Sequence, residues 1–249
     1  MEELLGSIRM ITNSNVFIYM IKGLGFTLVI ALVAVIMGII FGTLFALSRN
    51  YCNRGPAVIL KWFSIAYIEV FRNTPLMLWL FVGIVFFPSI ETSVSFASAF
   101  GLSRTEMAVL FKAIIALVLF TSSVIAEIVR GGLNSIDKGQ FEAAYSQGFS
   151  MAGALLLIVL PQTFRNIVPT LLSQIITTIK DTSYIANIAL AELLGRTFML
   201  IRSATLYTGL PTQNMSDVFI LCGLACIFYF IINFTLSIVV RRIQPKYTH

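Results

Sequence analysis

Charged side chains are scarce in the apolar part of this chain, and the few found there could pair with each other or bind a polar molecule. Glu69 and Arg72 lie three residues apart in one apolar run, so they share a helix face and can form an ion pair. Further along, Glu192 and Arg196 predict a second pair at a spacing of four. The alternative for Glu69 and Arg72 is a cavity wall, because charges within apolar spans are costly and usually face a cavity or a partner.

A second polar group surrounds the segment Lys180-Asp181-Thr182-Ser183, which interrupts another apolar run. Gln174 and Asp181 lie seven residues apart, on one face if the helix continues. The Asp181 carboxylate can accept an ammonium group, and backbone N–H groups at a helix restart near Thr182 and Ser183 can take a carboxylate. The alternative is that Lys180 and Asp181 only cap two half-helices, and the two roles do not exclude each other.

The sequence offers no set of side chains for catalysis. Its only histidine, His249, is the last residue, so we expect it to belong to a terminal tail and not to a catalytic site. The cysteines Cys52, Cys222 and Cys226 lack metal-ligand spacing. A phosphate loop of the GxxxxGK[ST] type needs a Gly-Lys pair, and the sequence has none. Any energy from ATP must therefore come from a separate subunit, and we expect this chain not to be an enzyme.

Composition indicates which elements must hold these residues. The chain has 249 residues, of which 58% are hydrophobic and 11% charged, whereas soluble domains carry about 25% charged residues. Several apolar runs are long enough to cross a bilayer as helices, which takes roughly 20 residues. The sequence predicts an all-α integral membrane protein, with residues 1–249 as one transmembrane domain. The net charge of +6 is assigned to cytoplasmic loops, where Lys and Arg collect, and not to a nucleic-acid partner.

Five membrane spans are predicted. They cover about residues 23–47, 62–87, 107–129, 167–200 and 218–240. The fourth is broken at residues 180–183, and broken helices at membrane depth are tolerated where they line a cavity. Residues 152–160 before it are apolar but short, and Pro161 is expected to end them. Gly38 and Gly42 form a small-xxx-small pattern that allows close helix approach, within one subunit or between two.

The placement of Lys and Arg predicts the orientation in the membrane. With the N-terminus outside, nine basic residues lie on the inner side: Arg49, Arg54, Lys61, Arg130, Lys138, Arg165, Arg241, Arg242 and Lys246. Five lie on the outer side: Arg9, Lys22, Arg104, Lys112 and Arg202. Because basic residues favour the cytoplasmic side, the N-terminus is expected outside and the C-terminus in the cytoplasm. A loop of about residues 130–165 is then cytoplasmic.

That loop contains a stretch of small and polar residues, 139–148, which predicts a short helix over 140–147. The Glu142 carboxylate lies in its first turn, where it suits the helix dipole. Gly148 can adopt the left-handed conformation that ends a helix, and Pro161 further along would fix the exit angle. From the residues alone, an ordinary capped loop helix is as well supported as a surface that a soluble protein grips.

Four blocks of this sequence resemble the polar amino acid branch of ABC importer permeases, the HisM/Q-like family with an EAA loop. The EAA loop itself is matched by Gly139-Gln140-x-Glu142-Ala143-Ala144-x3-Gly148, followed by Pro161. The other blocks are Glu69-Val70-Phe71-Arg72-Asn73-Thr74-Pro75-Leu76, Glu127-Ile128-Val129-Arg130-Gly131-Gly132 and Lys180-Asp181-Thr182-Ser183. Each block alone is weak, and all four in order form a specific pattern.

The resemblance implies a type I ABC importer permease with the MetI-like fold and five transmembrane helices, in a prokaryotic cell membrane. ABC ATPase subunits, which hold ATP and Mg²⁺, would dock on the EAA helix, and this chain would bind no cofactor. A second permease chain, identical or related, would complete the path, and an extracytoplasmic amino acid-binding protein would deliver the substrate. The residues expected to couple to the ATPase are Gly139, Gln140, Glu142, Ala143, Ala144, Gly148 and Pro161.

The residues expected to contact a polar amino acid are Gln174, Thr178, Asp181, Ser183, Asn187, Arg72 and Thr74. Asp181 would accept the α-amino group. Gln174 is a neutral amide, whereas a carrier of basic amino acids would more naturally present a carboxylate, so glutamine, glutamate or aspartate is the expected substrate. The alternative is a stand-alone secondary transporter, which broken helices would suit but which would not need a docking helix.

Overall fold

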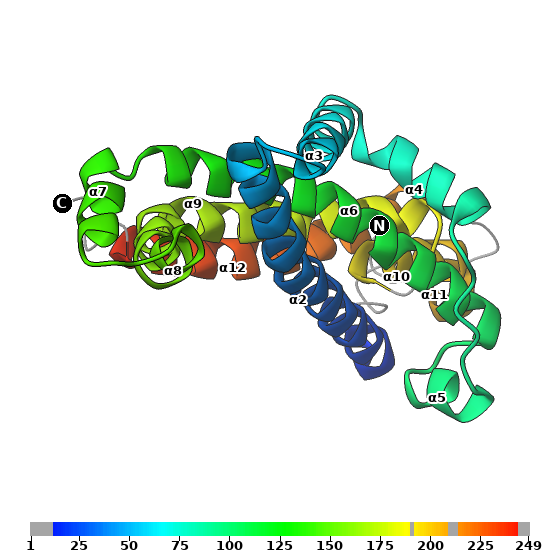
Figure 1. The fold of residues 1–249 in the computed structure, drawn as a ribbon. Coiled ribbons are helices and arrows are strands. Elements are labelled where there is room, and N and C mark those ends of the chain that lie inside the picture. The colour runs from blue at the N-terminus through cyan, green and yellow to red at the C-terminus, as the bar shows by residue number, and fades with distance from the viewer. Residues whose placement is uncertain (1–11, 190–191, 209–213, 244–249) are drawn as a thin grey trace. The chain divides into compact units, whose positions relative to one another are not determined.

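The computed structural model describes residues 12–189, 192–208 and 214–243, so the expectations for Arg9, Lys246 and His249 lie outside it. All regular structure in these ranges is helical (Figure 1), which confirms the predicted fold class. The α-helices are α2 (Ser14–Tyr51), α3 (Ala57–Arg72), α4 (Leu76–Phe86), α5 (Val94–Ala99), α6 (Arg104–Asn134), α7 (Lys138–Ser146), α8 (Met151–Ala154), α9 (Leu160–Asp181), α10 (Leu193–Arg202), α11 (Ala204–Thr208) and α12 (Met215–Ile243). A π-helical segment, η1 (Leu155–Val159), joins α8 to α9, and a 3-10 helix, η2 (Thr182–Asn187), follows α9.

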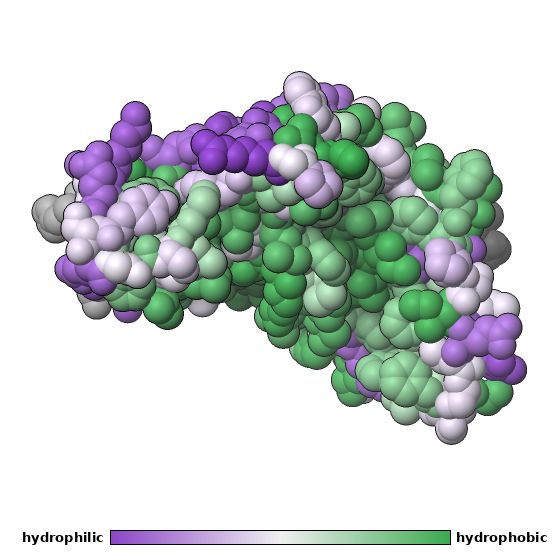
Figure 2. Space-filling view, in the orientation of Figure 1, coloured by the Kyte–Doolittle hydropathy of each residue, from purple (hydrophilic) through white to green (hydrophobic). Residues whose placement is uncertain are grey.

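Within the described ranges, four helical stretches are long and apolar enough to cross a membrane: α2, α6, Met151–Asn187 and α12. The pair α3 and α4 makes a fifth candidate span, interrupted between Arg72 and Leu76. Apolar side chains such as Leu32 and Leu44 are exposed on α2, and Figure 2 shows hydrophobic surface over the visible face of that helix. The five predicted spans therefore correspond to elements of the structure.

The predicted break at Pro161 is wrong. The helix continues from Met151 through η1 into α9, where Pro161 is the second residue. Proline lacks an N–H, and its ring crowds the carbonyl group four residues earlier. The wider π-helical segment η1 lies just before Pro161, and such bulges relieve this kind of conflict without ending the helix. The fourth span consequently begins at Met151 and not at Ile167.

The interruption predicted at residues 180–183 is present, but it is a change of helix type and not a gap. α9 ends at Asp181, whose backbone angles stay helical (φ −63°, ψ −26°), and η2 follows directly. The fourth span was expected to continue as a helix from residue 184 to about residue 200, and this expectation is wrong, since the 3-10 helix ends at Asn187 and α10 begins only at Leu193.

The chain divides into two compact units, and each is built from three segments. The first unit comprises Met1–Ala34, Leu76–Leu117 and Thr177–Thr235, and the second comprises Val35–Pro75, Val118–Ile176 and Leu236–His249. Apolar side chains form the core of the first unit, among them Val16, Met20, Leu193, Leu200 and Leu221. The core of the second unit includes Ile125, Val129, Leu133, Val159 and Ile167.

In the second unit, α2 and α6 approach each other closely at the two glycines of the small-xxx-small pattern. A Cβ atom at Gly42 would lie 2.9 Å from both the Ala126 nitrogen and the Ser122 carbonyl oxygen. A Cβ atom at Gly38 would lie 3.0 Å from the Ile125 side chain. The pattern therefore packs two helices within one subunit, as one of the two alternatives predicted.

Candidate functional site

The short helix α7 is fixed at both ends by its own sequence. Asp137 caps the N-terminus, because its Oδ1 accepts a hydrogen bond from the Gly139 N–H at 2.7 Å. At the C-terminus, Gly148 adopts a left-handed conformation with φ +84°, and the Phe149 N–H donates to the Ala144 carbonyl at 3.1 Å. The predicted helix and its glycine stop are confirmed, although the helix begins at Lys138 instead of residue 140. Because of this earlier start, Glu142 lies in the second turn, and its expected place in the first turn is wrong.

α7 has an inner face and an outer face. Ala144 is buried, and the ring of Phe141 lies 6.2 Å from that of Tyr51 at the end of α2. Glu142 and Ala143 point outward and are exposed, and Figure 2 shows hydrophilic surface over α7. Of the residues expected to couple to an ATPase, Ala144 is buried, and the others are exposed: Gly139, Gln140, Glu142, Ala143, Gly148 and Pro161.

The inner side of α7 is tied to the two long helices that flank it in the second unit. The Gln162 amide nitrogen near the start of α9 donates to the Gln140 amide oxygen at 3.0 Å. At the end of α6, Gly132 is buried, and a Cβ there would collide with the side chains of Thr163 and Ile167 on α9. The end of α6 and the start of α9 are therefore packed on each other, and α7 is bonded to the start of α9 through Gln140.

The residues expected to contact substrate are distributed over both units. Arg72, Thr74 and Gln174 belong to the second unit. Thr178, Asp181, Ser183 and Asn187 belong to the first, on the last turn of α9 and on η2. Thr178 is buried, Asp181 and Ser183 are half-buried and Asn187 is exposed. The structure thus gathers four of the seven on one helical segment.

The surroundings of Asp181 narrow its possible roles. Its side chain makes no capping hydrogen bond to η2, so the expected cap at this position is not found. Because the backbone stays helical through Asp181, the amides of Thr182 and Ser183 lie within a helix and do not form the expected restart. The Thr182 hydroxyl donates to the Ile179 carbonyl at 2.8 Å. The Asp181 carboxylate itself is half-buried and lies one helical turn after the buried Thr178.

The carboxylate of Glu192, just before α10, has a structural role that the sequence did not indicate. Its side chain is fully buried and caps α10, accepting hydrogen bonds from the Leu194 N–H (2.9 Å) and the Gly195 N–H (2.5 Å). The Tyr229 hydroxyl of α12 donates to the same carboxylate at 3.0 Å, and the Thr27 hydroxyl of α2 lies 3.5 Å away. Glu192 therefore joins three helices of the first unit.

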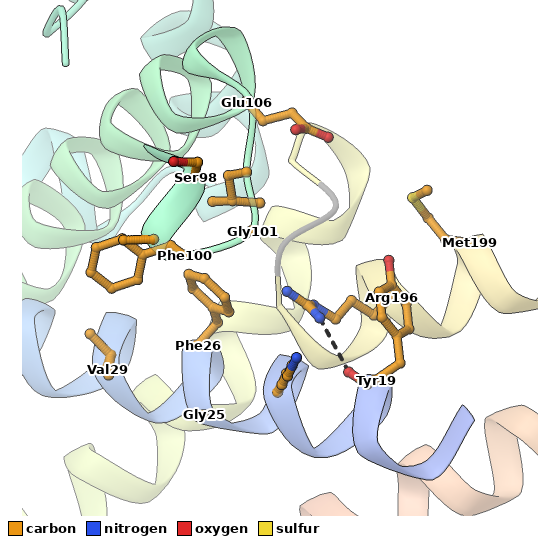
Figure 3. A pocket seen from close by; sticks show the side chains of 13 residues that line it. Tyr19, Gly25, Phe26, Val29, Ser98, Phe100, Gly101, Glu106, Arg196 and Met199 are labelled. Atoms are coloured by element: carbon orange, nitrogen blue, oxygen red, sulfur yellow. Dashed lines mark hydrogen bonds between the residues drawn. The ribbon is translucent and has the colours of Figure 1, made fainter. Parts of the chain in front are cut away.

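Arg196, expected to pair with Glu192, points to other partners. Its guanidinium lies 4.5 Å from the centre of the Tyr19 ring and 5.3 Å from that of Phe26, and it donates to the Tyr19 carbonyl at 3.3 Å (Figure 3). These residues line a cavity of about 760 Å³ in the first unit, together with Glu106. Glu106 accepts hydrogen bonds from the serine that precedes its own helix. None of the expected substrate residues is among those of the described chain that line this cavity.

In the second unit, Glu69 and Arg72 pair across helices and not with each other. Glu69 contacts Arg49 of α2 at 3.1 Å, and Arg72 contacts Glu127 of α6 at 3.6 Å. The described part of the chain holds no ion pair between Glu69 and Arg72, so the simple pairing on one helix face is wrong. Over the same ranges, no group of three or more His, Cys, Asp or Glu side chains is placed to hold a metal ion.

Comparison with known proteins agrees with this helical membrane architecture. The sequence profile of the family described as "Binding-protein-dependent transport system inner membrane component" matches residues 38–249. This chain belongs to that family.

Several relatives are amino acid permeases. The chain is 35% identical over 222 residues to the "Probable glutamine ABC transporter permease protein GlnP" of Bacillus subtilis, covering 89% of this chain and 90% of that one. It is 33% identical to the "Glutamate/aspartate import permease protein GltK" of Escherichia coli, covering 92% and 93%. It is 28% identical to the "Arginine transport system permease protein ArtQ" of Bacillus subtilis, covering 92% of each chain.

Solved structures show the same fold. One reported as "Crystal structure of an amino acid ABC transporter with histidines" superposes with a TM-score of 0.69 at 26% identity, covering 92% of this chain and 94% of that one. A chain of the MetNI methionine ABC transporter superposes with a TM-score of 0.66 at 18% identity, covering 93% and 99%. This chain is therefore an amino acid ABC transporter permease subunit of the MetI-like fold and a multi-pass inner membrane protein.

Proposed function

We propose that this chain imports polar amino acids with energy from a separate ATPase subunit, which docks on α7. The observation that carries the proposal is the geometry of α7 itself. The helix is capped at both ends, held from behind through Phe141 and Ala144, and exposes Glu142 and Ala143. A short helix fixed in this way can transmit a displacement to the longer helices that it contacts. ATP and Mg²⁺ belong to the partner, since this sequence has no phosphate loop.

The proposed assembly contains two permease chains, identical or related, two ATPase subunits and an extracytoplasmic amino acid-binding protein. Family membership supports partners of these kinds in general. The surplus of Lys and Arg in the loops assigned to the inner side supports an outer N-terminus and a cytoplasmic C-terminus. In this arrangement, the ATPases would close when they bind ATP, displace α7 and open the path to the outside. ATP hydrolysis would return the transporter to its starting conformation.

The proposed substrates are glutamine, glutamate or aspartate. The half-buried carboxylate of Asp181, beside the buried hydroxyl of Thr178, is suited to an α-amino group. The neutral amide of Gln174 on the same helix favours an uncharged or acidic substrate side chain over a basic one. The names of the relatives include glutamine and glutamate/aspartate permeases but also an arginine permease, so they are compatible with this choice and do not select it. Ser183, Asn187, Arg72 and Thr74 remain the other proposed contacts.

The assembly is tested by purifying the tagged chain from its native host in mild detergent and identifying the proteins that accompany it. An ATPase in equal proportion is the expected result, and the number of different permease chains distinguishes a homodimer from a heterodimer. Recovery of the chain alone, still able to carry amino acids into liposomes, would contradict the proposal and favour a secondary transporter.

The substrate site is tested separately with Asp181→Ala and Gln174→Ala in the purified transporter. Equilibrium binding of radiolabelled glutamine should weaken by about tenfold in each variant, the equivalent of one lost polar contact of about 1.4 kcal/mol. Ser173→Ala is the matched control, because Ser173 lies on the same helix, is exposed and bonds to the Pro169 carbonyl. Unchanged binding in both test variants would remove the basis for this site.

A further inference from the structure

Five charged side chains of the second unit form one network near the ends of three helices. Arg49 comes from the last turn of α2, Glu69 and Arg72 from the last turn of α3, and Glu127 and Arg130 from α6. Arg49 bridges the two carboxylates, at 3.1 Å from Glu69 and 3.4 Å from Glu127. The network therefore joins three helices. Arg49, Glu127 and Arg130 are half-buried, whereas Glu69 and Arg72 are exposed.

Glu127 is the centre of this network, because all three arginines approach its carboxylate. Arg130 binds both oxygens, donating from Nε to Oε2 at 2.9 Å and from its terminal nitrogen to Oε1. Arg49 and Arg72 approach Oε2 at 3.4 and 3.6 Å. The Glu127 side chain is 21% exposed, so these interactions are less screened than pairs on an open surface. Without its charge, three arginines would face the single carboxylate of Glu69.

On one side, this network is close to α7 along the chain. Glu127 lies on α6, which ends at Asn134, and α7 begins at Lys138. The end of α6 is fixed to α2, because the Asn50 side chain donates to that of Asn134 at 3.1 Å. It is also packed tightly on α9 at Gly132. Only residues 135–137 separate α6 from α7, so a displacement of α7 would act directly on this end of α6 and, through its contacts, on the charged turn and on α2.

On the other side, the network holds the point where the second span is interrupted. The Asn73 side chain donates to the Glu69 carbonyl at 2.8 Å, and the Thr74 hydroxyl donates to the Val70 carbonyl at 2.6 Å. Asn73 and Thr74, which belong to the interruption, are thus hydrogen-bonded to the turn that carries Glu69 and Arg72. Pro75 follows, and α4 begins at Leu76.

We propose that Glu127 is a positioning residue, which transmits the displacement of α7 to the end of α3 and so to the interruption at residues 73–75. This proposal rests on the proposed docking of an ATPase on α7. A carboxylate shared among three arginines suits this role, because it can keep α2, α3 and α6 connected while individual arginines exchange partners. A static clamp would instead affect only the stability of the fold.

The test compares amino acid uptake with ATP hydrolysis in the same proteoliposomes, using the complete transporter with its ATPase and binding protein. In Glu127→Gln, uptake per ATP hydrolysed should fall by roughly threefold or more, a typical effect for residues that connect two coupled sites. Arg49→Gln removes the bridge between the two carboxylates and should lower the ratio in the same direction. Glu127→Asp keeps the charge and should restore part of the ratio.

Glu106→Gln is the matched control. It is the same substitution on the same helix, α6, but Glu106 lies at the N-terminus of that helix and bonds to Ser103 there. It should leave the ratio unchanged. A wild-type ratio in both Glu127→Gln and Arg49→Gln would overturn the proposal, as would a loss of thermal stability in these variants with no change in the ratio. A wild-type transporter whose uptake ignores ATP would instead overturn the proposed function, so the two failures are distinguishable.

Discussion

Replacing Gly42 by alanine tests the close approach of α2 to α6. The added Cβ would lie 2.9 Å from the Ser122 carbonyl oxygen and the Ala126 nitrogen, and 3.0 Å from the Ile125 side chain. Two of these contacts are backbone atoms, which cannot rotate away, so the helices must separate. Overpacking of this kind costs about 2 kcal/mol. The packing of α2 on α6 is part of the second unit, so this destabilisation should lower the stability of the whole chain.

Gly25→Ala is the matched control on the same helix, because a Cβ at Gly25 would meet no atom within 4 Å. Any gain in helix propensity is common to both variants and cancels when they are compared. A difference of about 2 kcal/mol corresponds to an apparent melting temperature about 4–8 °C lower for Gly42→Ala than for Gly25→Ala.

The assay is the fraction of folded protein that survives heating in detergent, followed by size-exclusion chromatography at one fixed heating time, since membrane proteins often unfold irreversibly. Equal apparent melting temperatures for the two variants would refute the packing described for α2 and α6. A lower melting temperature for Gly25→Ala would refute it as well.

Three further predictions concern α7 and the cap of α10. Glu142→Ala should lower uptake by about tenfold, as for an exposed anchor of an interface, while membrane insertion stays normal; normal uptake with normal ATPase recovery would contradict its coupling role. Gly148→Ala should cost about 1–2 kcal/mol at its left-handed position and reduce the ATPase recovered with the chain, whereas Gly131→Ala, with open space around it, should not. Glu192→Ala should destabilise by roughly 2–4 kcal/mol, since it removes a helix cap and the carboxylate that accepts from the partly buried Tyr229 hydroxyl; Tyr229→Phe should cost about 1 kcal/mol, and equal melting shifts for these two variants would contradict the cap.

Elements determined by local signals could be predicted from the sequence. Gly148 ends α7 as predicted, because a left-handed turn depends on the residue at that position. The capping residue Asp137 is an equally local signal, and it explains why the helix begins before the predicted residue 140. The long apolar runs likewise predict spans, because backbone groups in lipid must be satisfied within a helix. The change at Asp181 was also signalled, as a polar interruption of an apolar run, although its 3-10 form was not.

Features that depend on a local change of helix type, on the residue at which a helix begins or on neighbouring helices could not be predicted. Pro161 was expected to end a helix, and only the π-helical segment η1 before it explains why the helix continues. The spacing of Glu192 and Arg196 is that of a pair within one helix, but α10 begins after Glu192, which leaves its carboxylate free to cap the helix. Glu69 and Arg72 share a helix face, yet each finds its partner on another helix. Spacing alone does not distinguish these cases.

The central claim, that a separate ATPase drives this permease, is tested most directly by uptake into proteoliposomes. The purified transporter and its binding protein would be reconstituted with ATP on the ATPase side, or with a non-hydrolysable ATP analogue. The account predicts accumulation of a labelled polar amino acid with ATP and none with the analogue. Equal accumulation with the analogue, or with no nucleotide, would contradict it.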